Sequence, residues 1–181
     1  MKINFILPEN ANRPVGGFKI VFQYANKLVD LGYDVSISFL NNLYPERTNK
    51  LKVKLARSVK KLLGINSQSR RITWFNLDPR VKLFYNIIGE NELPVSDVVI
   101  ATAVQTAKFL SNVDSRFGRK YYFIQNYETW AYPKEEVNDT FRLPFQKIVI
   151  AQWLYDIVVR ETNDNVFLVP NFLNKKVYYL A

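Results

Sequence analysis

The first forty residues constrain the fold more strongly than any other part of the chain. An apolar run, Lys2–Leu7, begins almost at the N-terminus. After a polar loop and the glycine pair Gly16-Gly17, apolar residues recur at helical spacing until Gly32. The next segment, Asp34–Leu40, alternates and is rich in Val, Ile and Phe, which is typical of a strand. The stretch therefore predicts a β-α-β unit.

The glycine pair at the start of the predicted helix is the first candidate binding feature. Gly16 and Gly17 leave backbone N–H groups accessible at the positive end of the helix dipole, which suits an anionic group. The alternative is a generic α/β unit in which the two glycines only permit a tight turn.

The rest of the chain alternates short apolar runs with segments of helical spacing. The predicted strands are Arg71–Phe75, Val81–Tyr85, Asp97–Ala101, Lys120–Ile124, Lys147–Ala151 and Val166–Val169. The predicted helices are Ala103–Leu110, a short piece over Asp139–Leu143, and Gln152–Thr162, with loops over Asn86–Pro94 and Trp130–Asn138. This order predicts a Rossmann-like α/β fold: a mostly parallel sheet with helices on both faces. Because no linker is visible, residues 1–181 are predicted to form one domain.

The composition excludes several kinds of chemistry. The 181 residues include neither Cys nor His, so Ser-His-Asp and Cys-His catalysis are excluded and zinc loses its commonest ligands. Any reaction must use carboxylates, Lys, Arg, Tyr, hydroxyl groups or groups of the substrate. No Asp-x-Asp pair or other ligand cluster stands out, and we expect neither a metal nor a cofactor.

Positive charge is concentrated in one segment. The chain carries a net charge of +9, and residues 41–71 hold nine basic residues and a single acid, so the remainder is almost neutral. Within this basic insertion, one face of a predicted amphipathic helix carries Leu51, Leu55, Val59 and Leu62, and the other carries Lys50, Lys54, Arg57 and Lys61.

The basic helix has more than one interpretation. It could dock to an anionic membrane surface, where each basic residue contributes about 1 kcal/mol. It could equally pack on the sheet and keep a solvated basic face. No nucleic acid is expected as a partner, because aromatic residues are not interleaved with the charges. Neither a secretory signal nor an apolar run of membrane-spanning length is visible, so we expect a cytoplasmic protein, peripheral at the inner face of the cell membrane.

Polar residues follow the predicted strands at their carboxyl ends, where open α/β sheets bind ligands. The candidate binding residues are Gly16, Gly17, Asn126, Tyr127, Glu128, Gln152 and Asn171. The most informative are Asn126-Tyr127-Glu128, in which an amide and a carboxylate flank an aromatic residue directly after a buried strand. We expect these residues to converge on one rim of the sheet.

Several of these segments resemble glycosyltransferase family 4 of the GT-B fold. The opening unit, with Leu31-Gly32-Tyr33-Asp34-Val35, is similar to the start of that family, although the histidine common in this turn is missing. A subgroup with rhamnosyltransferase-like members, which build cell-surface polysaccharides, is similar at Tyr122–Glu128, Arg142–Pro144 and Ile148–Leu154. Val169-Pro170-Asn171 is similar to the segment that ends the N-terminal domain. The departures are Asn126 for Asp, Ala151 for Ser and Phe172 for Gly, and residues 41–91 show no resemblance.

The resemblance implies an N-terminal, acceptor-side GT-B domain. The complete enzyme would transfer a hexosyl or rhamnosyl group from a nucleotide sugar to a hydroxyl group of a glycan or lipid-linked acceptor, with retention and without a metal. Gly16 and Gly17 would approach the donor phosphates or the acceptor, while Asn126 and Glu128 would orient acceptor hydroxyls and Gln152 would assist. Most donor contacts would come from a C-terminal domain that is absent here, so we expect this chain alone to be inactive.

Two other functions remain open at this point. The chain could be a non-catalytic α/β module that docks to an anionic membrane or nucleic acid through the basic helix. It could also be another nucleotide-binding relative with the GT-B fold, such as an epimerase.

Overall fold

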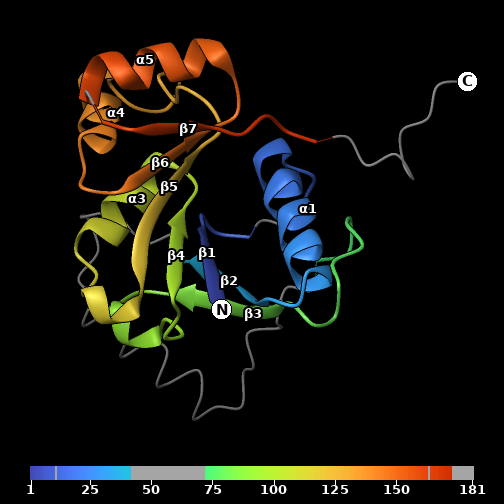
Figure 1. The fold of residues 1–181 in the computed structure, drawn as a ribbon. Coiled ribbons are helices and arrows are strands. Elements are labelled where there is room, and N and C mark those ends of the chain that lie inside the picture. Colours follow the sequence, from blue (N-terminus) through green and yellow to red (C-terminus); the bar gives the residue numbers. More distant parts are fainter. Residues whose placement is uncertain (11, 42–71, 163, 173–181) are drawn as a thin grey trace, which may run out of the picture.

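The computed structural model describes residues 1–10, 12–41, 72–162 and 164–172. Within them lies a seven-stranded, all-parallel sheet in the order β3-β2-β1-β4-β5-β6-β7 (Figure 1). Its strands are β1 (Lys2–Leu7), β2 (Asp34–Leu40), β3 (Lys82–Ile87), β4 (Val98–Ala101), β5 (Arg119–Ile124), β6 (Gln146–Val149) and β7 (Val166–Leu168). The predicted Rossmann-like α/β fold is confirmed.

Helices cover both faces of this sheet (Figure 1). The helices are α1 (Gly16–Asp30), α3 (Val104–Ser111), α4 (Lys134–Phe141) and α5 (Gln152–Thr162), and short 3-10 turns are η1 (Glu90–Glu92) and η2 (Ser115–Phe117). Helix α1 packs on one face, where Phe22 and Ala25 are fully buried, and α3, α4 and α5 pack on the other. Successive strand residues point to opposite faces, so β1, β2, β4 and β5 each place buried residues in both cores.

The direction of chain progression across the sheet reverses between β1 and β4. From β1 the chain passes through α1 to β2 on one side, whereas β4 leads through α3 to β5 on the other. The loops that leave β1 and β4 therefore diverge to opposite faces, which opens a crevice at the carboxyl ends of these two strands.

Two local predictions are wrong. Lys134–Asn138 was expected in a loop, but helix α4 runs over Lys134–Phe141. Pro133 directly before the helix, with Glu135 and Glu136 in its first turn, is a start signal that the polar composition obscured. The helix consequently ends at Phe141 rather than extending to Leu143.

The strand predicted over Arg71–Phe75 does not form in the described residues 72–75, and Arg71 lies outside them. Trp74 and Phe75 instead pack against Phe22 of α1, each with ring centroids 5.5 Å from it. Burial of these aromatic rings against the helix outweighs the β propensity of the segment.

The basic helix with Lys50, Lys54, Arg57 and Lys61 also lies outside the described residues. Of the helices that the structure does describe, none combines the length and the apolar character needed to cross a bilayer.

Candidate functional site

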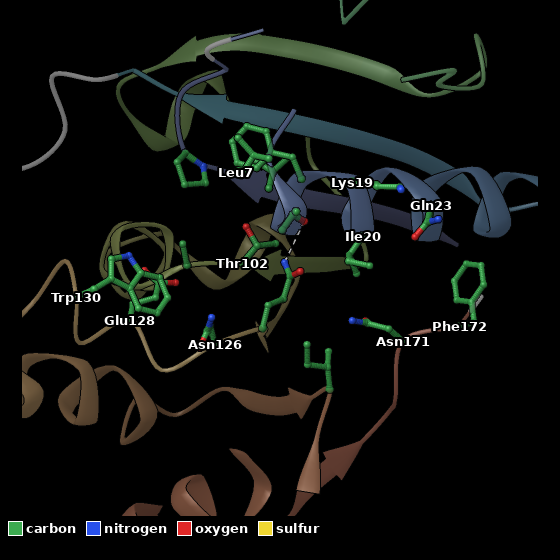
Figure 2. Close-up of a pocket in the computed structure, with 18 residues that line it drawn as sticks. Leu7, Lys19, Ile20, Gln23, Thr102, Asn126, Glu128, Trp130, Asn171 and Phe172 are labelled. Atoms are coloured by element: carbon green, nitrogen blue, oxygen red, sulfur yellow. Dashed lines mark hydrogen bonds between the residues drawn. The ribbon is translucent and has the colours of Figure 1, made fainter. Parts of the chain in front are cut away.

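A cleft of about 540 Å³ opens at the carboxyl edge of the sheet, at the reversal between β1 and β4 (Figure 2). The end of β1, the first turns of α1 and the segments after β4, β5, β6 and β7 form its walls. The cleft is lined by five of the seven predicted binding residues, namely Gly16, Gly17, Asn126, Glu128 and Asn171. Residues 155 positions apart in the chain thus share one concave surface.

The N-terminus of α1 faces this cleft without a cap. Val15 occupies the N-cap position and offers no side-chain hydrogen bond, and the first turn contains no acidic residue. The N–H groups of a first helical turn have no partner within their own helix, and they carry the positive end of its dipole. Within the described residues no side chain caps these donors, and such a helix terminus suits an anionic ligand.

The backbone does not require glycine at either of the first two positions of α1. Neither Gly16 nor Gly17 has a positive φ, in contrast to Gly32 and Gly118. A Cβ atom at Gly16 would have no neighbour within 4 Å, and one at Gly17 would only make ordinary contact with the Gln125 side chain, at 3.6 Å. Glycine in a helix costs up to about 1 kcal/mol relative to alanine. Packing among the described residues therefore does not account for either glycine.

Gln125 joins two walls of the cleft and was not among the predicted binding residues. Its Nε2 donates a hydrogen bond to the carbonyl oxygen of Gly17 over 3.2 Å, so the end of β5 is tied to the first turn of α1 (Figure 2). The sequence signal was its place at the end of a predicted strand, beside Asn126.

The carboxylate of Glu128 lies at the N-terminus of α3. Its Oε2 accepts a long hydrogen bond from the backbone N–H of Val104 (3.4 Å), while Thr106 Oγ1 accepts from the N–H groups of Thr102 and Ala103. The protein's own side chains therefore cap α3, unlike α1.

Partial burial makes the Glu128 carboxylate chemically unusual. Burial raises its pKa from 4.5 to about 7, and the Val104 N–H only partly opposes this. No ion pair to Glu128 occurs among the described residues, so no neighbouring cation stabilises the ionised form. A carboxyl group with this pKa can accept or release a proton near neutral pH.

The other two predicted binding residues do not line the cleft. The hydroxyl group of Tyr127 donates to Asn138 Oδ1 (2.7 Å), and its ring packs against Phe141. Gln152 lies on α5, where its Nε2 donates to Asp156 Oδ1 (2.8 Å). Tyr127 therefore anchors the loop after β5, and the side chain of Gln152 belongs to the exposed surface of α5.

Sequence reasoning also missed Trp130, whose ring lines the cleft. It was placed in a loop without a pattern that marks a binding residue. Within the described parts of the chain, no group of three or more acidic side chains forms a metal-binding cluster.

No protein-family model matches this chain, and a search of curated proteins finds no significant match. The functional assignment therefore depends on the fold, on the cleft and on the motif resemblances.

Proposed function

We propose that this chain is the acceptor-side domain of a GT-B glycosyltransferase, which transfers a sugar from a nucleotide-sugar donor to a hydroxyl group of a glycan or lipid-linked acceptor. The observation that carries the proposal is the convergence of the uncapped α1 terminus and of the Asn126, Glu128 and Asn171 side chains on one cleft. The resemblance of Tyr122–Glu128 to rhamnosyltransferase-like proteins of family 4 supports the class of reaction that we propose.

Two walls of the cleft suit the two ligands of such a reaction, which are an anionic donor and a neutral acceptor. The departing nucleoside diphosphate is anionic, and the free N–H groups of Gly16 and Gly17 would stabilise charge that develops on it. A neutral acceptor hydroxyl needs hydrogen-bond acceptors and donors instead, which Glu128 and Asn126 provide on the opposite wall. The carboxylate would repel a phosphate, so the ligands are expected to bind in one orientation.

The direct test is sugar transfer by the protein made from the complete reading frame that contains this sequence. Incubation with a panel of nucleotide sugars and glycan acceptors should release nucleoside diphosphate. The variant Gly17→Ala adds a methyl group beside Gln125 that the protein itself can accommodate, and it is expected to lower kcat/KM about tenfold, because the methyl group takes up space where the donor phosphate is proposed to approach the helix terminus. Gly89→Ala is the matched control, since a Cβ there meets nothing within 4 Å and Gly89 does not line the cleft. The absence of release with every donor would contradict the proposal.

A binding experiment tests the assignment to the acceptor side. Titration of residues 1–181 with nucleotide sugars should give weak or no binding, because most donor contacts are proposed to come from a second domain. Tight binding of a nucleotide sugar to this chain would show that the donor site had been assigned to the wrong half of the enzyme.

A further inference from the structure

The turn that follows β5 presents two side chains to the cleft from a rigid base. Tyr127 and Tyr132 pack against the core beneath α3 and α4, whereas Glu128 and Trp130, between them, line the cleft. The carbonyl oxygen of Glu128 accepts hydrogen bonds from the N–H groups of Ala131 (3.0 Å) and Tyr132 (3.2 Å). These hydrogen bonds order the backbone of the turn that carries both cleft residues, which lowers the entropic cost of binding.

Trp130 is exposed although it is the kind of side chain that a protein normally covers. Its side chain is 69% exposed, more than any other large hydrophobic residue in the described ranges. Figure 2 shows it beside Glu128 at one end of the cleft, with Asn126 nearby and Asn171 and Phe172 at the other end. A flat apolar ring next to an amide and a carboxylate matches a ligand that has an apolar face and a rim of hydroxyl groups.

Both polar neighbours of Trp130 have hydrogen-bonding capacity left. Glu128 uses Oε2 for Val104, and within the described residues its Oε1 has no hydrogen-bond partner. Asn126 uses Oδ1 to accept from the N–H of Tyr127 (2.8 Å), so its Nδ2 stays available as a donor. One acceptor and one donor thus lie on the cleft side of the indole ring (Figure 2).

We propose that Trp130, Glu128 and Asn126 form a subsite for a neutral saccharide. A sugar ring stacks on the indole, one hydroxyl donates to Glu128 Oε1, and Asn126 Nδ2 donates to a second sugar oxygen. The inference rests on the proposed function in taking the saccharide to be the glycan acceptor. A nucleobase could also stack on Trp130, but its phosphates would lie near an uncompensated carboxylate.

This arrangement makes binding depend on the ionisation of Glu128. A hydroxyl that donates to the carboxylate favours its ionised form, and the pKa of Glu128 is about 7 in the free protein. Saccharide affinity is therefore expected to increase as the pH is raised from below to above this value. The variant Glu128→Gln keeps an acceptor oxygen but cannot ionise, so its affinity should not change across the same interval.

The test is saturation-transfer NMR and calorimetry on residues 1–181 with a panel of neutral disaccharide methyl glycosides: rhamnobiose, mannobiose, galactobiose and cellobiose. At least one should bind in the millimolar range. Trp130→Ala is expected to weaken that binding about tenfold, and Trp130→Phe by less, because a smaller aromatic ring remains. Trp153→Ala is the matched control: Trp153 is 51% exposed on α5, does not line the cleft, and its loss should leave affinity unchanged.

The outcomes separate this inference from the proposed function. Equal loss in Trp130→Ala and Trp153→Ala, nucleosides binding at Trp130 in place of saccharides, or no binding of any disaccharide would each overturn the subsite. If nucleoside diphosphate is released normally by Trp130→Ala in the complete protein, the transferase proposal survives without the subsite. If Trp130-dependent saccharide binding occurs but no donor is ever consumed, the subsite stands and the transferase proposal fails.

Discussion

Polar groups and glycines have different contacts at the two edges of the parallel sheet. At the amino edge, Ser96 Oγ donates to the carbonyl oxygen of Phe117 (2.9 Å), and the almost fully buried Lys147 forms an ion pair with Asp164. Gly118 has a φ of +125°, and a Cβ there would lie 2.8 Å from the carbonyl oxygen of Ser96.

At the carboxyl edge, several glycines and polar groups have fewer contacts with the rest of the protein. Gly16 and Gly17 have room for a side chain, the N-terminus of α1 has no side-chain cap, and Glu128 keeps a raised pKa without a paired cation among the described residues. The amino edge is therefore stabilised by contacts within the protein, whereas the carboxyl edge keeps polar groups that such contacts leave unsatisfied, which supports the ligand site that we propose there.

The largest predicted effect lies at the amino edge. Gly118→Ala should lower the free energy of unfolding by about 3 kcal/mol, because alanine disfavours the left-handed backbone and its methyl group would contact the Ser96 backbone. Urea unfolding followed by circular dichroism measures this, with Gly89→Ala as the control that should unfold like the unmodified protein. If Gly118→Ala were as stable as Gly89→Ala, the close contact at Gly118 would not contribute to the stability of the amino edge.

The next largest effect is expected at the carboxyl group of Glu128. Burial raises the pKa of Glu128 above its unfolded value of 4.5, so the penalty is absent below about pH 4.5, grows between 4.5 and 7, and is complete above 7. Glu128→Gln should therefore raise the free energy of unfolding by about 2–3 kcal/mol at pH 8, since each pKa unit corresponds to about 1.4 kcal/mol and the carboxyl group is not fully buried, and should leave it nearly unchanged at pH 4.5. The same difference at both pH values would show that the effect does not come from ionisation.

The smallest effect sharpens the contrast between the glycines. Gly16→Ala should raise the free energy of unfolding by about 0.5 kcal/mol, since alanine is the better helix former and its methyl group meets nothing within 4 Å. Thermal melts of Gly16→Ala and Gly118→Ala, run side by side, should show a higher melting temperature for the first variant and a lower one for the second. A destabilised Gly16→Ala variant would mean that the fold itself requires this glycine.

Much of the fold could be predicted from local patterns. The strands Lys2–Leu7 and Asp34–Leu40 and the helix Gln152–Thr162 were predicted with the bounds they have in the structure. Helix α4 was misplaced because Val137, Thr140 and Phe141 show their shared buried face only once they pack in the core. Polar composition alone favours a loop there.

The candidate site was predicted less completely than the fold. The predicted convergence holds for five residues because the carboxyl ends of parallel strands share one edge, and the cleft there is lined by Gly16, Gly17, Asn126, Glu128 and Asn171. Tyr127 looked equivalent to its neighbours, but contacts with Asn138 and Phe141 turn it into the core. Trp130 was missed because no local pattern distinguishes a loop tryptophan that lines a cleft from one elsewhere on the surface.

The order of strands and helices, the parallel sheet and the exclusion of histidine and cysteine chemistry are properties of the sequence by itself. Periodicity is set by consecutive residues, and a residue type that is missing cannot be supplied by folding. Only the tertiary structure decided that the N-terminus of α1 lies at the cleft, which side chains of the turn after β5 line it, and that burial raises the pKa of Glu128 to about 7. Those properties depend on burial and hydrogen bonds between segments that are far apart in the chain, and no local pattern encodes them.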